Sequence, residues 1–237
     1  MTDGNDLAAL ADRVAREGPS AAERSVARMY EEDPFWWERF GERGRRFADE
    51  DGQYHVTYLV EALRQGSPLT LVEYARWLRG VLTARGMCTL HLVENLGRLA
   101  TVLVGRDATM GPAAGFLRAA IAGLEYADGP AAGLQGAADE VAEAVASELA
   151  GAEDASDDAA WREARHLVSY VADALASGRG DLLAAHVKWL AGALRERSEG
   201  PDPARLFDAV ERALSALPEG AQRATSSFRA ARREAGA

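Results

Sequence analysis

The sequence has a single cysteine, no long apolar run and almost no strand pattern. The lone Cys88 excludes an intrachain disulfide and fits a reducing compartment. No segment approaches the roughly 18–20 apolar residues that span a bilayer. The acidic start MTDGNDLAALADRVAREG also lacks the apolar run of a signal peptide. We therefore expect a cytoplasmic protein that does not enter a membrane.

Positive charge is also scarce. The chain has 27 Lys and Arg against 37 Asp and Glu, a formal net charge of −10. Nucleic acids and anionic membranes attract concentrated Lys and Arg, so neither is an expected partner. The motifs GxSxG and HExxH and a Gly-rich phosphate loop are absent too, which leaves nucleophilic catalysis poorly supported.

Helix signals are present throughout. Ala, Leu, Glu and Arg dominate, and apolar residues recur at spacings of three and four. The pattern predicts an all-α protein. We expect helices over 6–17, 20–33, 34–47, 52–65, 69–85, 88–104, 111–126, 133–149, 158–176, 181–197 and 203–217. Gly18-Pro19, Gly66 and Gly86 are the expected stops, 151–158 is an expected linker, and the basic tail beyond Glu219 is expected to be a weak or frayed helix.

Residues 56–85 recur at 168–197 with a constant offset of 112 residues and no gap. The identities are Val56, Tyr58, Ala62, Leu63, Gly66, Leu71, Trp77, Leu78, Gly80, Leu82 and Arg85, matched by Val168, Tyr170, Ala174, Leu175, Gly178, Leu183, Trp189, Leu190, Gly192, Leu194 and Arg197. We interpret this as an internal duplication of a helical module. It predicts two related four-helix-type bundles, 1–110 and 111–237, either separate or fused into one pseudo-twofold domain. The repeated Gly80 and Gly192 lie inside helices, where we expect a close approach of another helix.

The histidines do not form a metal site. Glu163 and His166 make the one ExxH motif, whereas a di-iron bundle needs two. Cys88 and His91 supply only two ligands, too few for zinc. We expect His166 on a solvated helix face with Ser169 and Asp173, and His91 on the surface. His186 replaces Tyr74 in the second copy, which suits either the edge of the core or a pocket wall.

Aromatic and arginine residues concentrate between Asp33 and His55. Trp36 and Trp37 are adjacent, so one of them must lie at an edge, a partner surface or a cavity. Core packing explains the stripe, but a cavity with arginines at its rim also suits a large flat ligand with carboxylate arms. Cys88 at a helix start near Arg85 is either an inert apolar residue or a reactive thiol.

A longer pattern carries a family resemblance. Residues 58–67, YLVEALRQGS, with Trp77, Arg85-Gly86 and the Leu-rich stretch 90–103, resemble the helical module that caps cobalamin in cobalamin-binding domains. Relatives of that module look like sensors of linear tetrapyrroles such as biliverdin. The chain lacks the DxHxxG motif and the α/β domain of cobalamin proteins, and the Glu-His pair that follows the cap's Trp. The resemblance therefore implies a bundle with a tetrapyrrole-sized groove but no cobalt ligand and no catalytic residue.

We expect a non-enzymatic sensory or ligand-binding protein that holds a tetrapyrrole, such as a bilin, in its first module. Cys88 is the expected attachment point, and the arginines would pair with propionates. The candidate ligand-binding residues are Trp36, Trp37, Arg39, Phe40, Arg43, His55, Tyr58, Tyr74, Arg76, Trp77, Cys88 and His91. One alternative is an interaction scaffold that dimerises or binds a signalling partner through exposed aromatics. Another is a ferritin-like oxidase.

Overall fold

The computed structural model describes residues 4–150, 157–197, 199–218 and 222–237. Over these residues the chain forms ten α-helices and two short 3-10 helices and contains no strand, which confirms the all-α prediction. The chain divides into two compact units. The first comprises Met1–Gly80 and His91–Leu124, and the second Val81–Leu90 and Glu125–Ala237.

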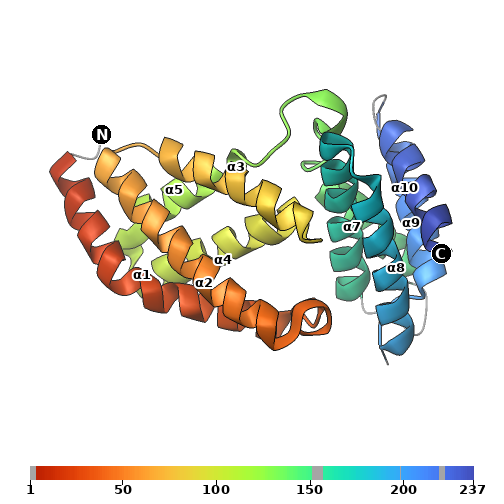
Figure 1. Ribbon diagram of the computed structural model, residues 1–237, viewed down its shortest axis with the longest axis horizontal. Coiled ribbons are helices and arrows are strands. Elements are labelled where there is room, and N and C mark those ends of the chain that lie inside the picture. The colour runs from red at the N-terminus through yellow and green to blue at the C-terminus, as the bar shows by residue number, and fades with distance from the viewer. Residues whose placement is uncertain (1–3, 151–156, 198, 219–221) are drawn as a thin grey trace. The chain divides into compact units, whose positions relative to one another are not determined.

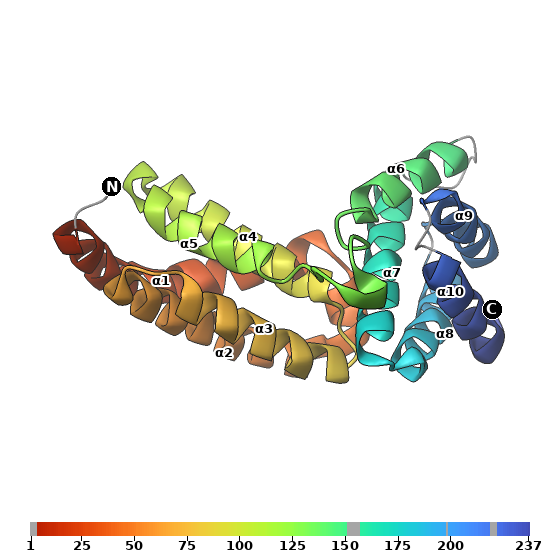
Figure 2. The ribbon, with the colours of Figure 1, turned by 90° about the horizontal axis from the view of Figure 1, so that it is seen from above.

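The first unit is built from five helices and the 3-10 turn η1. They are α1 (Gly4–Glu32), α2 (Phe35–Gln65), most of α3 (Leu69–Ala84), most of α4 (Thr89–Arg106), η1 (Ala108–Met110) and α5 (Gly111–Ala122). Figure 1 shows α1 beside α2 along much of its length. Figure 2 shows α4 and α5 forming a layer apart from α2 and α3. The sequence-based division at residue 110 differs from this unit, because α5 packs on α2.

The α1 helix runs through Gly18-Pro19, where the sequence predicted the end of one helix and the start of another. The buried face explains the continuity, because it extends on both sides of Pro19 from Val14 to Ala22. Tertiary packing of an apolar face outweighs the local cost of a helical proline. Gly18 contributes to that packing, since a Cβ there would lie 2.6 Å from Cγ1 of Val56.

The α2 helix also joins two predicted helices. Gly52, expected to start a new helix, lies within α2, where a Cβ would meet the Cβ of Ala22 at 3.2 Å. The interruption lies instead at Gly41, whose φ of 54° and ψ of −154° kink the helix. Only glycine adopts such angles readily. The helix ends as predicted at Gly66, which has a left-handed φ of 68°.

The second unit contains the segment Val81–Leu90 and the remaining helices. These are η2 (Gly129–Ala131), α6 (Ala138–Leu149), α7 (Asp157–Ser177), α8 (Gly180–Glu196), α9 (Pro203–Ala216) and α10 (Gln222–Ala235). Most of the expected linker at 151–158 lies outside the described residues. The internal duplication stays a prediction.

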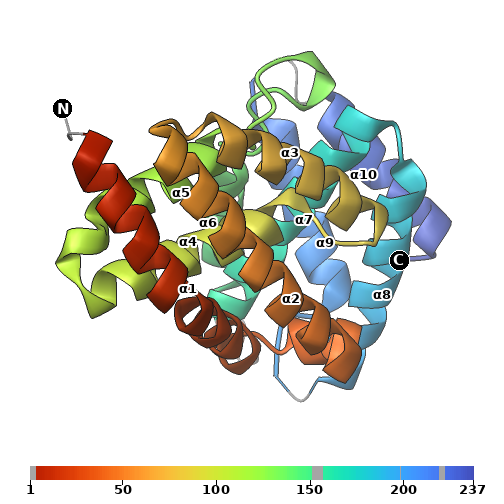
Figure 3. The ribbon, with the colours of Figure 1, turned by 60° about the vertical axis from the view of Figure 1, so that its left-hand side comes forward.

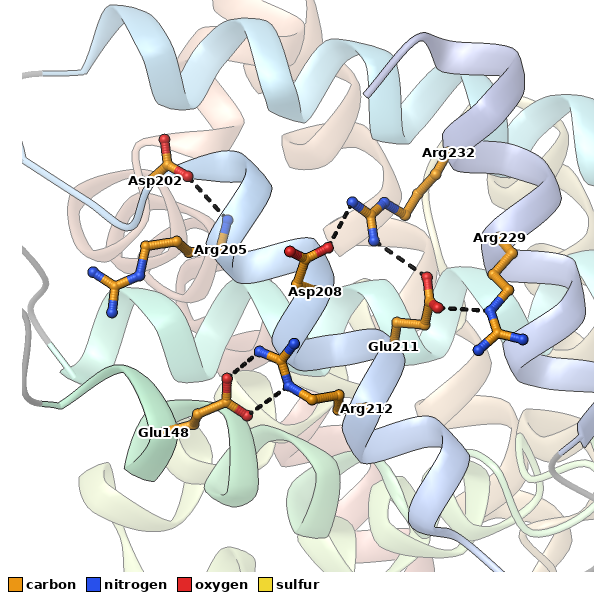
Figure 4. Close-up of polar contacts among 8 residues, drawn as sticks. All are labelled: Glu148, Asp202, Arg205, Asp208, Glu211, Arg212, Arg229 and Arg232. Carbon is orange, nitrogen blue, oxygen red and sulfur yellow. Dashed lines mark hydrogen bonds and ion pairs between the residues drawn. The ribbon is translucent and has the colours of Figure 1, made fainter.

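The basic tail forms a packed helix, α10, rather than a frayed end. Figure 3 shows α10 in the second unit close to α8, and its face with Phe228 is buried against the unit. Arg232 lies 2.9 Å from Asp208 and 3.2 Å from Glu211 of α9, and Arg229 lies 2.6 Å from Glu211 (Figure 4). The sequence-based expectation missed these partners because they lie on another helix.

The repeated helix-interior glycines do not mark close contacts. A Cβ on Gly80 or on Gly192 would meet nothing within 4 Å. The prediction of close helix approach at these two positions is therefore wrong, whereas Gly18 and Gly52 do fulfil that role. No helix within the described ranges has the length and apolar character needed to cross a bilayer.

Candidate functional site

The twelve candidate residues are divided between the two units of the chain. Eleven belong to the first unit, and Cys88 belongs to the second. Within the first unit the aromatic candidates form two groups. We call them the buried aromatic cluster (Tyr30, Phe35, Trp36, Phe40 and His91) and the aromatic surface (Tyr54, Tyr58, Tyr74 and Trp77).

The buried aromatic cluster is part of the core. Phe35 and Trp36 are buried, and the His91 ring stacks on Phe35 with centroids 4.5 Å apart and planes at 20°. His91 also lies edge-on to Trp36 at 5.1 Å. The expectation of a surface His91 is therefore wrong, because this end of α4 packs against the aromatic start of α2.

The neighbours of this cluster point outward. Trp37 is 44% exposed, and its ring contacts Tyr30 edge-on at 4.8 Å, so one of the two adjacent tryptophans lies at an edge as expected. The Arg43 guanidinium lies 5.5 Å from the centroid of Phe47. Arg39 is partly exposed, and Phe40 is the one member of the cluster that is not fully buried. The arginines thus flank the buried aromatic cluster at its exposed side.

The aromatic surface is formed by neighbouring turns of α2 and α3. Tyr58 stacks on Tyr74 with centroids 4.0 Å apart and planes at 13°, and Tyr74 lies 6.2 Å from Trp77 at 33°. Two outer rings are open to solvent, Trp77 being 63% and Tyr54 59% exposed. Tyr74 is itself only 6% exposed, so the open part of this face is made by Tyr54, Tyr58 and Trp77, with Tyr74 packed between Tyr58 and Trp77.

A buried histidine, His55, contacts the aromatic surface on its inner side. His55 Nδ1 lies 2.8 Å from the Tyr74 hydroxyl, while His55 Nε2 has no hydrogen-bond partner among the described residues. Complete burial lowers the pKa of His55 to about 4, because the charged ring would lose its hydration. Burial likewise raises the pKa of Tyr74. Both groups are neutral at pH 7, so the pair fixes the position of the Tyr74 ring without adding charge.

The arginine of this surface is held by the end of another helix. Arg76, exposed and next to Trp77 in the chain, donates from Nε to the Gly123 carbonyl at 2.9 Å. Arg79 donates to the Leu124 carbonyl at 2.7 Å. Cations favour the C-terminal end of a helix, where carbonyls lack partners. The two contacts anchor α3 to the end of α5.

A groove of about 390 Å³ runs beside the aromatic surface, between α1 and α2. Its lining residues are Ala15, Pro19, Gln53, Val56, Thr57, Tyr58, Val60, Glu61 and Arg64. Tyr58 is the one candidate residue that lines it. Its volume falls in the range of small-ligand sites, roughly 300–1,000 Å³.

Cys88 lies in a buried part of the second unit, next to Thr89 and Leu90. The backbone N–H of Thr89 donates to Asp173 at 2.7 Å, and that of Leu90 to the Ser169 hydroxyl at 3.0 Å. These contacts hold the thiol's neighbours against α7. A fully buried thiol is typical of the inert apolar role and not of a reactive cysteine.

This polar group on α7 was missed by the sequence analysis. Ser169, Asp173 and His166 were expected to be solvated, but all three are buried. Asp173 also accepts from the Thr89 hydroxyl at 2.5 Å and from the Tyr126 hydroxyl at 2.7 Å. The expectation was wrong because these polar side chains bind backbone and hydroxyl groups brought from elsewhere in the chain, a pattern that helical periodicity cannot distinguish from a solvated face.

The ExxH motif is not part of a metal site in the structure. Glu163 accepts from Arg197 at 2.8 Å as a largely buried ion pair. Over the residues that the structure describes, no group of three or more His, Cys, Asp or Glu side chains is arranged to hold a metal ion.

The second unit repeats the ring arrangement of the aromatic surface. Tyr170 stacks on His186 with centroids 3.6 Å apart and planes at 16°, and His186 lies 5.7 Å from Trp189 at 32°. These residues occupy the positions of Tyr58, Tyr74 and Trp77 at the 112-residue offset. Unlike its counterpart, Tyr170 is buried, so the open face is a property of the first copy.

Comparisons with family models, with curated proteins and with solved structures find no match to this chain.

Proposed function

We propose that this protein is a non-enzymatic binding protein whose first unit takes a flat ligand on the aromatic surface, with a linear tetrapyrrole such as biliverdin as the leading candidate. The observation that supports the proposal is the ring series Tyr58–Tyr74–Trp77, which is ordered by stacking and open to solvent at its outer end.

The chemistry of the surface suits a planar, conjugated ligand. Aromatic rings attract flat π-systems in offset-stacked or edge-on arrangements, each pair contributing roughly 0.5–1.5 kcal/mol beyond apolar burial. Because Tyr74 is held by both Tyr58 and His55, little side-chain freedom is lost when a ligand binds. A ligand that covers Trp77 and Tyr54 would remove two large apolar side chains from water.

The carboxylate groups of a tetrapyrrole would need a cationic partner, for which Arg76 is the candidate on α3. Arg76 is exposed and adjacent to Trp77 in the chain, and its contact with the Gly123 carbonyl fixes its Nε. A guanidinium pairs strongly with a carboxylate. We therefore propose the propionate role for Arg76 rather than for Arg39 and Arg43, which flank the buried aromatic cluster. Since Cys88 is buried, we propose that binding is non-covalent.

The proposal is tested by mixing the purified protein with biliverdin and recording the absorption spectrum. Binding should shift and sharpen the long-wavelength band and raise the melting temperature. Replacing Cys88 with Ala should leave both effects unchanged. A spectrum identical to that of free biliverdin, together with no thermal shift from biliverdin, haem or cobalamin, would disprove tetrapyrrole binding.

Self-association through the same surface is the second candidate. Leu69, at the start of α3, is a further exposed apolar side chain, 58% accessible, on the helix that carries Trp77. Contiguous exposed apolar side chains often mark protein interfaces. Light scattering after size exclusion would show a dimer for the unmodified chain and a monomer for Trp77→Ala. A monomer in both cases rules out this alternative.

A further inference from the structure

Part of the α1–α2 groove of the first unit corresponds to a face of α7 in the second unit, and another segment of the chain binds that face. Three residues of the groove, Thr57, Tyr58 and Glu61, correspond at the 112-residue offset to Ser169, Tyr170 and Asp173 of α7. The residue types keep their chemistry: a hydroxyl, a phenol and a carboxylate occupy the same three helical positions in both copies.

In the second unit these three side chains bind the start of a helix. The Tyr170 hydroxyl donates to the Gly86 carbonyl at 2.8 Å. The Ser169 hydroxyl accepts from the Leu90 N–H, and the Asp173 carboxylate from the Thr89 N–H, as described above. Side chains of α7 thus bind the carbonyl of the turn before α4 and two of the amide groups that a helix start leaves without intrahelical partners.

The corresponding residues of the first unit are open. Tyr170 is 3% exposed and Tyr58 is 36% exposed. Thr57 and Glu61 are exposed as well, whereas Ser169 and Asp173 are buried. In the second unit the segment Gly86–Leu90 binds this face of α7, and Gln135 and Tyr126 add further hydrogen bonds to Ser169 and Asp173.

From this correspondence we infer that the groove beside Thr57, Tyr58 and Glu61 is a docking site for a helix N-terminus and its preceding turn, supplied by a partner protein. Charge complementarity supports this occupant, because the positive end of a helix dipole meets the Glu61 carboxylate. The Tyr58 hydroxyl would donate to the turn carbonyl, and Thr57 and Glu61 would accept from the first amides. The site goes beyond the proposed flat-ligand surface and shares only Tyr58 with it.

The probe is a synthetic peptide of residues 84–100, the natural occupant of the α7 face, with Cys88→Ser and a fluorophore at its C-terminus. Fluorescence anisotropy with the intact protein should show saturable binding. Glu61→Gln should weaken it about tenfold, the equivalent of about 1.4 kcal/mol, and Tyr58→Phe and Thr57→Val should also weaken it. Glu73→Gln, the same charge change at an exposed site on α3, should leave binding unchanged.

A second peptide tests the bonding pattern. Thr89→Pro with Leu90→Pro removes both N–H donors from the probe, so this peptide should not bind. The inference is overturned if the first peptide does not bind at millimolar concentration, or if Glu61→Gln and the proline peptide change nothing. It is overturned too if the protein is a dimer that Glu61→Gln dissociates, since a second copy would then be the occupant. Tetrapyrrole binding can fail independently, because Thr57 and Glu61 lie outside the aromatic surface.

Discussion

The ionisation of His55 is altered by folding within an accessible range of pH. Its folded-state pKa of about 4 lies below the value near 6.5 of an exposed histidine, because burial penalises the charged ring. The unfolded chain therefore takes up the proton first as the pH falls. The stability conferred by neutral His55 is complete above pH 6.5 and is lost as the pH decreases toward 4.

This predicts that the free energy of unfolding falls by up to about 3 kcal/mol between pH 6.5 and pH 4 on account of His55. Urea denaturation at a series of pH values measures the effect. The double variant His55→Leu/Tyr74→Phe, which removes both hydrogen-bonding groups of the pair, should lose that part of the slope. An unchanged slope in the double variant would show that other groups account for the acid sensitivity.

At the scale of the helix, glycines with similar sequence surroundings have opposite roles. Gly80 lies within α3, and an added Cβ would meet nothing within 4 Å. Gly80→Ala should therefore stabilise the protein by about 0.5–1 kcal/mol, because it lowers the conformational entropy of the unfolded chain. Gly192→Ala should behave in the same way. Thermal denaturation measures both.

Gly41 is the matched contrast, because its surroundings are equally open but its φ is 54°. Gly41→Ala should destabilise the first unit by about 1–3 kcal/mol through backbone strain. A stabilising Gly41→Ala would mean that α2 can straighten at this point without loss of packing.

Helix α10 is held by one buried ring and a set of ion pairs. Phe228 is fully buried and meets Phe207 edge-on at 6.1 Å, so Phe228→Ala should cost about 3–5 kcal/mol. Arg232→Ala should cost about 1 kcal/mol, because Arg232 pairs with two carboxylates and lies over Phe207.

Arg229→Ala serves as the control, since Arg229 makes one half-exposed ion pair and should cost no more than about 0.5 kcal/mol. Urea denaturation of the three variants ranks them. Equal effects of the two arginine variants would argue that the bridging position of Arg232 adds nothing.

The contrast between local sequence signals and packing against other helices explains how much of the fold was predictable. Helix content and the stop at Gly66 follow from local propensity and backbone geometry, which the sequence carries directly. The continuity of α1 through Pro19 and the packing of α10 depend on faces supplied by other helices. Local sequence signals cannot report such faces.

At the scale of the whole chain, the candidate site was also hard to predict, because the sequence does not report which side chains other helices cover. Three of the candidate residues, Tyr58, Tyr74 and Trp77, lie side by side on α2 and α3. Trp36 and His91 were grouped with them, although they belong to the buried aromatic cluster. Composition identifies aromatic residues, but only the packed structure separates a core ring from a surface ring.

The whole molecule therefore presents two copies of one ring arrangement, one open and one covered. Tyr58–Tyr74–Trp77 and Tyr170–His186–Trp189 have closely similar spacings and tilts. They differ in exposure, since Tyr58 is 36% exposed and Tyr170 is 3% exposed. Binding should accordingly depend on α2 and α3.

The most direct test is a biliverdin titration, followed by absorbance, of the unmodified protein and of Trp77→Ala, Tyr54→Ala and Phe47→Ala. Trp77 and Tyr54 belong to the aromatic surface, while Phe47 is an exposed ring, 40% accessible, outside it. We expect Trp77→Ala and Tyr54→Ala to weaken binding about tenfold or more and Phe47→Ala to bind as the unmodified protein does. Equal affinities across all four proteins, or no binding to any of them, would contradict this expectation.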